Sequence, residues 1–257
     1  KKKKIVQNIL FVYDRKKKKK RKISINSNKW LKNYLDATKI KEVDIIIELI
    51  GGADGPAKKL VFNALRNKKH VVTANKALIS KYGDKLAKIA EENNVNLEFE
   101  ASVCGGVPII RSLKEGLIAN KIEKVYGIFN GTSNYILSTM DKDKKDFGEV
   151  LNEAKDLGYA ESNPISDLNG EDVSSKLKIL SSLCFNSFIN HNIHIEGINS
   201  IDKKDILNAN KLGYKIKLLG VSEIINERLY QRVHPTLIKK SSYIASIDGV
   251  LNAVIVD

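Results

Sequence analysis

Residues 43–59 read VDIIIELIGGADGPAKK, and this segment decides the fold class. The run from Val43 to Ile50 is short and rich in isoleucine, which is typical of a strand buried on both faces. The glycines at 51, 52 and 55 predict a turn, and Pro56 suits the first position of a helix that we expect to run to about Asn67. A buried strand, a glycine turn and a helix in this order favour a parallel sheet.

The same alternation of strands and helices continues on both sides of this segment. Such a βαβ pattern predicts a Rossmann-like domain that binds its ligand at the carboxyl ends of the strands. The further strands expected here are Ile5–Tyr13, His70–Thr73 and Asn96–Glu100, and the further helices are Trp30–Ala37 and Leu78–Asn93.

The pattern changes near Val103, where the small-residue stretch SVCGGVP ends the alternation. We therefore expect two domains, residues 1–103 and 104–257, the second being an α+β domain with a mixed or antiparallel sheet. Its expected helices are Pro108–Asn120, Phe147–Leu157 and one from near Asp172, and its expected strands are Ile122–Phe129, Tyr214–Glu223, Leu229–Leu237 and Val250–Val256.

Charge is concentrated at the amino end of this chain of 257 residues. The formal net charge is +14, but 12 of the 44 Lys and Arg residues lie among residues 1–22 with one acid. The remainder carries 32 basic against 29 acidic groups and is almost neutral. A nucleic-acid binder usually spreads its positive charge over a folded face, so the balance weighs against that class.

Cysteine content and hydropathy indicate the compartment. Two cysteines, Cys104 and Cys184, are too few for a disulfide scaffold and favour a reducing environment. No stretch approaches the roughly 20 apolar residues of a membrane span. We expect a cytoplasmic protein.

Acidic residues and one lysine are concentrated in residues 157–176. Asp172 and Lys176 stand four residues apart, so they share one helical face. This pair is either an oriented proton donor or an exposed ion pair worth only about 0.3–0.5 kcal/mol, and spacing alone does not choose. A second candidate is Lys76, which follows the strand His70–Thr73 and could reach a cofactor or an anionic substrate.

Several segments together resemble one enzyme family. Residues 154–176, AKDLGYAESNPISDLNGEDVSSK, are similar to the signature of homoserine dehydrogenase. The resemblance extends over roughly residues 43–257, in the family order. The other similar segments are ELIGG (48–52), VVTANKALIS (71–80), FEASVCGGVPII (99–110), NGTSNYIL (130–137) and RVHPTLI (232–238).

The resemblance implies an oxidoreductase that interconverts aspartate 4-semialdehyde and homoserine with NADP or NAD, in threonine, methionine and isoleucine biosynthesis. Lys176 would then transfer the proton, and Asp172 would hold its amine. Lys76 would lie between the nicotinamide and the substrate. The resemblance assigns Gly158, Glu161 and Asp167 to the substrate, and Ile50, Gly51, Gly52, Thr73 and Lys76 to the cofactor.

The resemblance also implies a cation site and a dimer. Main-chain oxygens of Glu100, Val103, Gly105 and Val107 would hold a sodium ion, as carbonyls suit hard cations. The sheet of the second domain would pair across a homodimer. No membrane partner is expected.

The chain departs from the family at both ends. A dinucleotide-binding fold should open with a strand and the loop G-x-G-x-x-G, and this sequence has neither. We expect that the chain begins near the second strand, with Ile5–Tyr13 in that role, and stops before the family's glycine-rich closing segment. After that strand, Asp14 could accept a hydrogen bond from the ribose 2′-OH of NAD, whereas Arg15 could pair with the 2′-phosphate of NADP. The sequence leaves the choice between NAD and NADP open, and we lean towards NADP.

Two other readings remain at this point. Residues 1–22 could bind nucleic acid or another acidic surface without sequence preference. Alternatively, Cys104 could be the thiol nucleophile of an aldehyde dehydrogenase, although no basic residue stands near it in sequence to activate it.

Overall fold

A computed structural model describes residues 8–17, 20–185 and 193–257. It divides into two compact units, Lys1–Phe99 and Glu100–Asp257. The division comes four residues before the expected boundary after Val103. Each unit has its own sheet, and the two sheets differ in strand direction.

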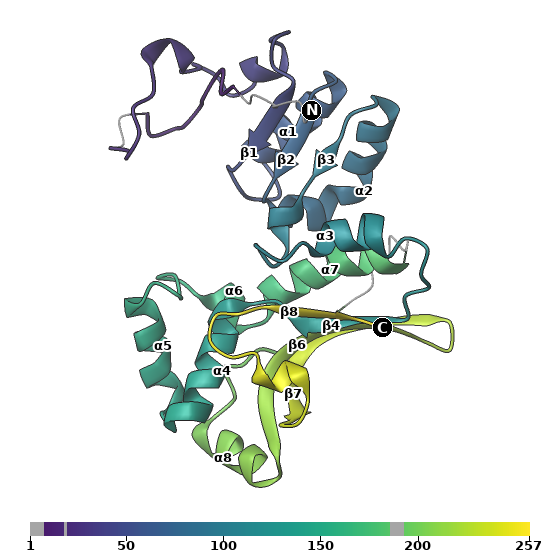
Figure 1. The fold of residues 1–257 in the computed structure, drawn as a ribbon. Coiled ribbons are helices and arrows are strands. Elements are labelled where there is room, and N and C mark those ends of the chain that lie inside the picture. The colour runs from purple at the N-terminus through teal and green to yellow at the C-terminus, as the bar shows by residue number, and fades with distance from the viewer. Residues whose placement is uncertain (1–7, 18–19, 186–192) are drawn as a thin grey trace, which may run out of the picture. The chain divides into compact units, whose positions relative to one another are not determined.

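Unit 1 is built on a parallel sheet of three strands in the order β1-β2-β3 (Figure 1). The helices α1 and α2 follow β1 and β2, as the βα pattern predicts. Pro56 begins α1, and Asn75 caps α2 by accepting a hydrogen bond from the backbone N–H of Leu78. The bounds are β1 Ile45–Glu48, α1 Pro56–Arg66, β2 His70–Thr73, α2 Lys76–Glu92 and β3 Leu97–Glu98.

The sheet of unit 1 is covered on one face within this chain. Ile46 and Glu48 of β1 are buried, whereas Ile45 and Ile47, which point to the other face, are 54% and 65% exposed. The expectation of a strand buried on both faces is therefore wrong for this chain. The reason is that α1, with a fully buried Val61, packs against the first of these faces.

The segment before β1 differs from the expected strand and helix. Residues 5–7 of the expected strand lie outside the described part of the chain, and residues 8–13 form only an isolated bridge, Val12 to Trp30. In place of a helix over Trp30–Ala37, there are two single turns of 3₁₀-helix, η1 (Ser27–Lys29) and η2 (Asp36–Thr38). With Lys and Asn throughout, this stretch has too few apolar residues to form a buried helical face.

Unit 2 is an α+β unit with a mixed sheet of five strands in the order β5-β7-β6-β4-β8. The long strands β6 and β7 form an antiparallel hairpin over their whole length, and only β5 runs parallel to its neighbour. The strands are β4 Lys124–Ile128, β5 His194–Ile195, β6 Tyr214–Ile225, β7 Arg228–Lys239 and β8 Ala253–Val256.

The helices of unit 2 match the expected helices only in part. The expected helix over Pro108–Asn120 is shorter: α3 runs from Ile109 to Arg111 and passes into a π-helical turn, η4, at Ser112–Gly116. The helix α4 was not expected from the sequence. The remaining elements are η3 Glu100–Ser102, α4 Gly131–Asp143, α5 Phe147–Asp156, α6 Ile165–Leu168, α7 Glu171–Phe185, α8 Lys203–Lys211 and η5 Tyr243–Ser246.

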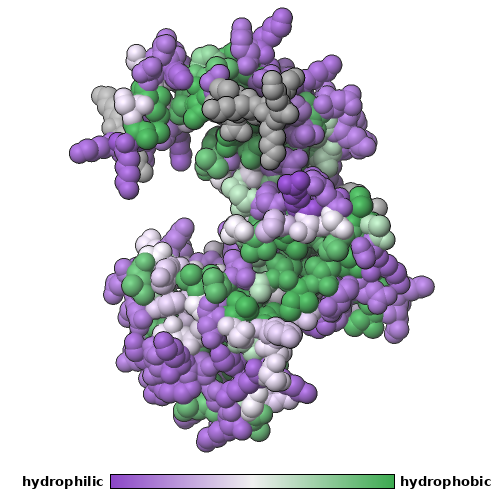
Figure 2. Space-filling view, viewed as in Figure 1, coloured by the Kyte–Doolittle hydropathy of each residue, from purple (hydrophilic) through white to green (hydrophobic). Residues whose placement is uncertain are grey.

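The two faces of the unit 2 sheet have different cover. On one face, Ser222 of β6 hydrogen-bonds Ser181 of α7. On the other face, an apolar cluster that includes Leu219 and Val221 packs under η5, and Tyr126 and Ile255 lie at its margin, partly exposed. Figure 2 shows a continuous hydrophobic area over β4, β6 and β8. Within the described residues, no helix is long and apolar enough to cross a bilayer.

Candidate active site

The first turn of α4 is the centre of the candidate site in unit 2. Asn130 caps this helix: its Oδ1 accepts from the N–H of Ser133 at 2.7 Å. The cap places Asn130, which is 4% exposed, between the end of β4 and two later helices. Gly131 is required here, because a Cβ on it would lie 2.8 Å from the carbonyl oxygen of Val250.

Two acidic residues meet at this cap. The Nδ2 of Asn130 donates to Asp167 Oδ1 at 2.7 Å and to Asp172 Oδ2 at 2.8 Å. Asp167 comes from α6 and Asp172 from the first turn of α7, 37 and 42 residues away in sequence. One amide therefore joins three helices.

Lys176 completes the cluster. Its Nζ lies 2.8 Å from Asp172 Oδ2 and donates to the carbonyl oxygen of Phe129 at 2.6 Å. The side chains of Lys176 and Asp172 are 14% and 3% exposed, so Asp172 is buried, Lys176 is partly buried, and the pair is not the exposed ion pair that the spacing left open. Each member is a partner of the other, and both have further hydrogen bonds.

The turn after α5 reaches the same cap. Gly158 ends α5 with a φ of +76°, as expected of a left-handed cap. The hydroxyl of Thr132 then donates to the carbonyl of Tyr159 at 2.7 Å, which attaches this turn to the start of α4. Glu161 follows in the loop between α5 and α6 and is exposed. The structure thus gathers Gly158, Asp167, Asp172 and Lys176 around α4 and places Glu161 on the adjoining loop.

Cys104 lies near this cluster but is not a nucleophile. Burial raises the pKa of its thiol to about 11; the positive charge of Lys176 lowers it, and the negative charge of Asp172 raises it. Because the thiolate is the reactive form, a thiol with this pKa is almost entirely unreactive at neutral pH. This geometry argues against the aldehyde dehydrogenase reading.

The loop from Glu100 to Val107 contains the expected cation ligands. The carboxylate of Glu100 is already engaged, as it accepts from the N–H groups of Ile110 and Arg111 at 2.9 Å each. The carbonyls of Glu100 and Val107 each accept one backbone hydrogen bond and keep a second lone pair. Main-chain oxygens of Glu100, Val103, Gly105 and Val107 therefore stay the predicted ligands of a hard cation. The described residues contain no cluster of three His, Cys, Asp or Glu side chains suited to a metal.

Unit 1 carries a second network at the carboxyl ends of β1 and β2. The buried carboxylate of Glu48 accepts from the N–H groups of Ile50 and Gly51, at 2.6 and 2.9 Å, and from the Thr73 hydroxyl at 2.6 Å. Asn75 joins the same two loops by donating from Nδ2 to the carbonyl of Gly52 at 2.8 Å.

This network fits a nucleotide loop. Gly51 and Gly52 have φ values of +84° and +82°, and a Cβ on Gly51 would meet nothing within 4 Å, so the backbone there is open to close approach. The candidate cofactor residues Ile50, Gly51, Gly52 and Thr73 thus belong to one hydrogen-bonded group. Lys76 is the first residue of α2 and is exposed.

Asp14, which follows the expected strand Ile5–Tyr13, has a basic partner. Asp14 Oδ2 lies 2.6 Å from Nη2 of Arg21, and the Arg21 guanidinium lies 5.0 Å from the centre of the Trp30 ring. The Lys17 ammonium lies 5.6 Å from the same ring. This pairing engages Asp14 with Arg21 and leaves the choice between NAD and NADP a prediction.

Sequence reasoning missed several residues of these sites. Asn130, Glu48 and Asn75 were quoted within similar segments but were given no role. A signal existed for Asn130 and Asn75, because each precedes a helix at the preferred capping position. No local signal could have placed Asn130 against Asp167 and Asp172, which are distant in sequence.

Lys217 was also missed. It is 1% exposed, and its Nζ contacts Asn134 Oδ1, Ser138 Oγ, the Ile247 carbonyl and Asp248 Oδ1 at 2.7–3.0 Å. Burial lowers the pKa of Lys217, and the Asp248 carboxylate acts in the opposite direction.

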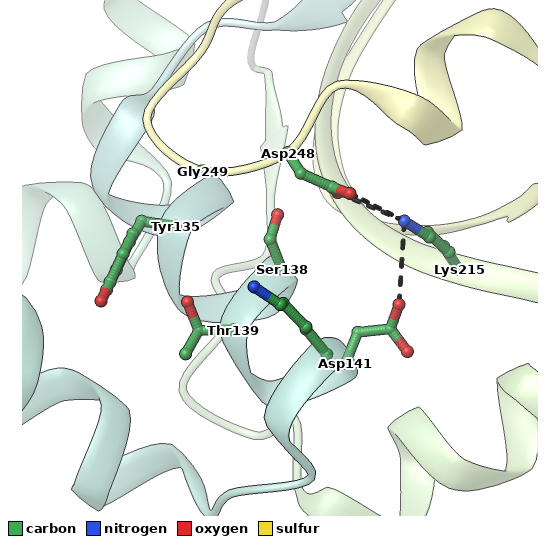
Figure 3. A pocket seen from close by; sticks show the side chains of 8 residues that line it. Tyr135, Ser138, Thr139, Asp141, Lys215, Asp248 and Gly249 are labelled. Carbon is green, nitrogen blue, oxygen red and sulfur yellow. Dashed lines mark hydrogen bonds and ion pairs between the residues drawn. The ribbon is translucent and has the colours of Figure 1, made fainter.

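A cavity of about 430 Å³ is lined in part by Ser138 and Asp248, two of the residues that Lys217 contacts (Figure 3). Lys215 on its wall pairs with Asp248 at 3.0 Å and with Asp141 at 3.8 Å. Three of the charged residues around the cavity, Lys215, Asp141 and Asp248, are thus paired with one another. The cavity is separate from the residues gathered at Asn130.

Comparison with known proteins identifies the family. A homoserine dehydrogenase family model matches residues 108–257, and a model of the homoserine dehydrogenase NAD binding domain matches residues 1–100. The homoserine dehydrogenase of Neisseria gonorrhoeae is 47% identical over 226 residues, which cover 88% of this chain and 52% of that protein. The homoserine dehydrogenase of Bacillus subtilis is 41% identical over 239 residues, which cover 93% of this chain and 55% of that protein.

Solved structures agree with these matches. A homoserine dehydrogenase from Thiobacillus denitrificans superposes with a TM-score of 0.86 at 46% identity, covering 90% of this chain and 54% of that one. A hyperthermophilic archaeal homoserine dehydrogenase in complex with NADPH superposes with a TM-score of 0.72 at 26% identity, covering 87% of this chain and 65% of that one. The chain spans about half the length of the curated relatives that it matches. With both units matched, and with the residues of the family signature gathered around one helix cap, the chain belongs to the homoserine dehydrogenase family.

Proposed function

We propose that this chain forms the nucleotide-binding and substrate-binding parts of an enzyme that interconverts aspartate 4-semialdehyde and homoserine with NADP or NAD. The observation that carries this proposal is the hydrogen-bonded cluster in which Asn130 meets Lys176, Asp172 and Asp167 of the family's signature segment. Family membership supports the reaction class.

Lys176 is the proposed proton donor and acceptor at the substrate oxygen. An ammonium has three N–H groups, and two acceptors for it are found among the described residues, Asp172 and the Phe129 carbonyl. The third N–H is then available for the substrate. The bound nicotinamide cofactor supplies or accepts the hydride at the substrate carbon. As negative charge develops on the aldehyde oxygen, Lys176 donates a proton to it, and in the reverse direction it removes one.

The remaining residues of unit 2 bind the substrate's amino-acid head. Its ammonium requires carboxylate partners, and Asp167 and Glu161 supply them in this proposal. Gly158 has no side chain and allows the backbone of its turn to approach the substrate. Asp172 holds the Lys176 amine in place.

The cofactor lies along the loops after β1 and β2 in this proposal. Glu48 and Asn75 hold these two loops together. The proposed contacts with the cofactor come from the loop residues Ile50, Gly51, Gly52 and Thr73. Lys76, exposed at the start of α2, is the proposed residue between the nicotinamide and the substrate. The choice between NAD and NADP stays a prediction.

A sodium ion and a second subunit complete the proposal. The carbonyls of Glu100, Val103, Gly105 and Val107 would hold the ion. The loop that carries them also contains Cys104, which lies near Lys176 and Asp172. The second copy would cover the partly exposed face of the unit 2 sheet. A cytoplasmic location stays a prediction from the cysteine content.

The test is a homoserine-dependent assay of NADPH formation. It uses this chain and, in parallel, the same chain completed with the flanking segments of the Thiobacillus denitrificans relative, because the chain spans about half of such proteins. We expect the completed protein to oxidise homoserine and not its isomer threonine, whose hydroxyl lies one carbon closer to the amino-acid head and whose carbinol carbon carries a methyl. The absence of activity from both proteins, with both folded by circular dichroism, would contradict the proposal.

A further inference from the structure

The side chain of Asn130 has every polar group in use. Its Oδ1 accepts from the Ser133 N–H at 2.7 Å, and its Nδ2 donates to Asp167 at 2.7 Å and to Asp172 at 2.8 Å. Because a backbone N–H can pair only with the oxygen, the cap fixes which end of the amide faces the acids. The donor end therefore points at the two carboxylates.

The Asn130 amide reduces the repulsion between two neighbouring carboxylates. Two carboxylates, from α6 and α7, converge on one buried point, and like charges at such separations repel. The two N–H groups of Nδ2 stabilise the charged form of both acids without adding charge. Lys176 pairs with Asp172. Because Asn130 donates to both acids, its amide joins Asp167 to the lysine pair.

We propose that Asn130 is a positioning residue, which orients Asp172 and through it the Lys176 amine, and which keeps Asp167 charged and directed for the substrate. Its effect on turnover rests on the proposed function, whereas its effect on the two acids does not. Asn130 touches neither the substrate nor the cofactor in this proposal.

The substitution that isolates this role is Asn130→Ser. Serine is as good a helix cap as asparagine, so α4 keeps its first turn, but a serine hydroxyl cannot donate to both acids. The matched control is Asp146→Ser, which makes the corresponding change at the cap of α5, an exposed position.

The first measurement is independent of activity. The carboxyl carbons of Asp167 and Asp172 are titrated by NMR in this chain with labelled aspartate. In Asn130→Ser we expect both midpoints to move to higher pH, by about half a unit or more, because hydrogen bonds to the charged forms are lost. The neighbouring charged and titratable groups, Lys176 and Cys104, are the same in both proteins. The control should leave both midpoints in place, and unchanged midpoints in Asn130→Ser would overturn the proposal.

The second measurement is kinetic and uses the completed protein. We expect Asn130→Ser to lower kcat/KM for homoserine by about 10², with the KM for NADP changed less than twofold. In an Asp167→Asn background the same change should have a smaller effect, because one of its two partners is already gone. Equal effects in both backgrounds would limit the role of Asn130 to capping. Failure of the function proposal would appear separately, as an inactive parent protein.

Discussion

Lys176 is held by one carboxylate and one carbonyl, and this arrangement makes a definite prediction at the residue scale. We expect Lys176→Ala to lower kcat by about 10² or more, since the proton donor is removed. The control is Lys178→Ala, an exposed lysine two residues further along the same helix, which should leave kcat unchanged. Near-normal turnover by a folded Lys176→Ala protein would remove this residue from the proton transfer.

Glu161 allows a prediction about affinity. Glu161→Gln keeps the shape of the side chain and removes its charge, so we expect a higher KM for homoserine and little change in kcat. Glu171→Gln is the matched control, because it removes an exposed carboxylate from the same segment. If both variants show the parent's KM, the ammonium of the substrate is bound elsewhere.

Residue types and spacing predicted much of the site, but not the contacts between distant segments. The separation of Asp172 and Lys176 by four residues placed them on one face correctly. Whether the pair was buried depended on Phe129 and Asn130, more than 40 residues away. A local sequence pattern cannot predict such contacts, because they form only in the tertiary fold.

At the scale of elements, the strand β4 has a tight contact that can be tested. A Cβ on Gly127 would lie 2.0 Å from the carbonyl oxygen of Ala253 in β8 and 2.7 Å from the ring of Phe129. We expect Gly127→Ala to lower the free energy of unfolding by about 3 kcal/mol, as measured in urea.

The control for this prediction is Gly148→Ala in α5. A Cβ on Gly148 would meet nothing within 4 Å, and alanine favours a helix, so we expect a gain of about 0.5 kcal/mol. If Gly127→Ala were tolerated as well as Gly148→Ala, β8 would not be packed on β4 as described.

Elements with one clear period were predicted well, and those with mixed signals were not. His70–Thr73 matches β2, and the helix expected over Leu78–Asn93 is α2, shifted by two residues at its start. The helix α4 was missed because GTSNYILSTM contains glycine, β-branched and small polar residues with weak helix propensity. Its stability comes from the Asn130 cap and from burial against the sheet.

At the scale of the whole molecule, the partly exposed face of the unit 2 sheet predicts the assembly. The register places Ile255, Tyr126 and Val221 side by side on β8, β4 and β6, so they share one face. We expect light scattering to give twice the chain mass of 28.7 kDa. Ile255→Glu should shift the protein towards the monomer, because it places a charge in the interface.

Leu212→Glu is the control for the assembly, since Leu212 is apolar and 70% exposed at the end of α8, away from that face. It should leave the mass unchanged. A monomeric parent protein, or a dimeric Ile255→Glu variant, would contradict the dimer.

Both cysteines have protected thiols, and this makes the chain convenient for site-specific labelling. Burial raises the pKa of Cys104 to about 11 and that of Cys184 to about 12. At pH 7 their thiolate fractions are then on the order of 10⁻⁴ or less. A cysteine introduced at exposed Lys85 in unit 1 or Lys178 in unit 2 would react with a maleimide dye while both natural thiols stay intact. A donor and an acceptor fluorophore on these two positions would measure the distance between unit 1 and unit 2 in the presence and absence of NADPH.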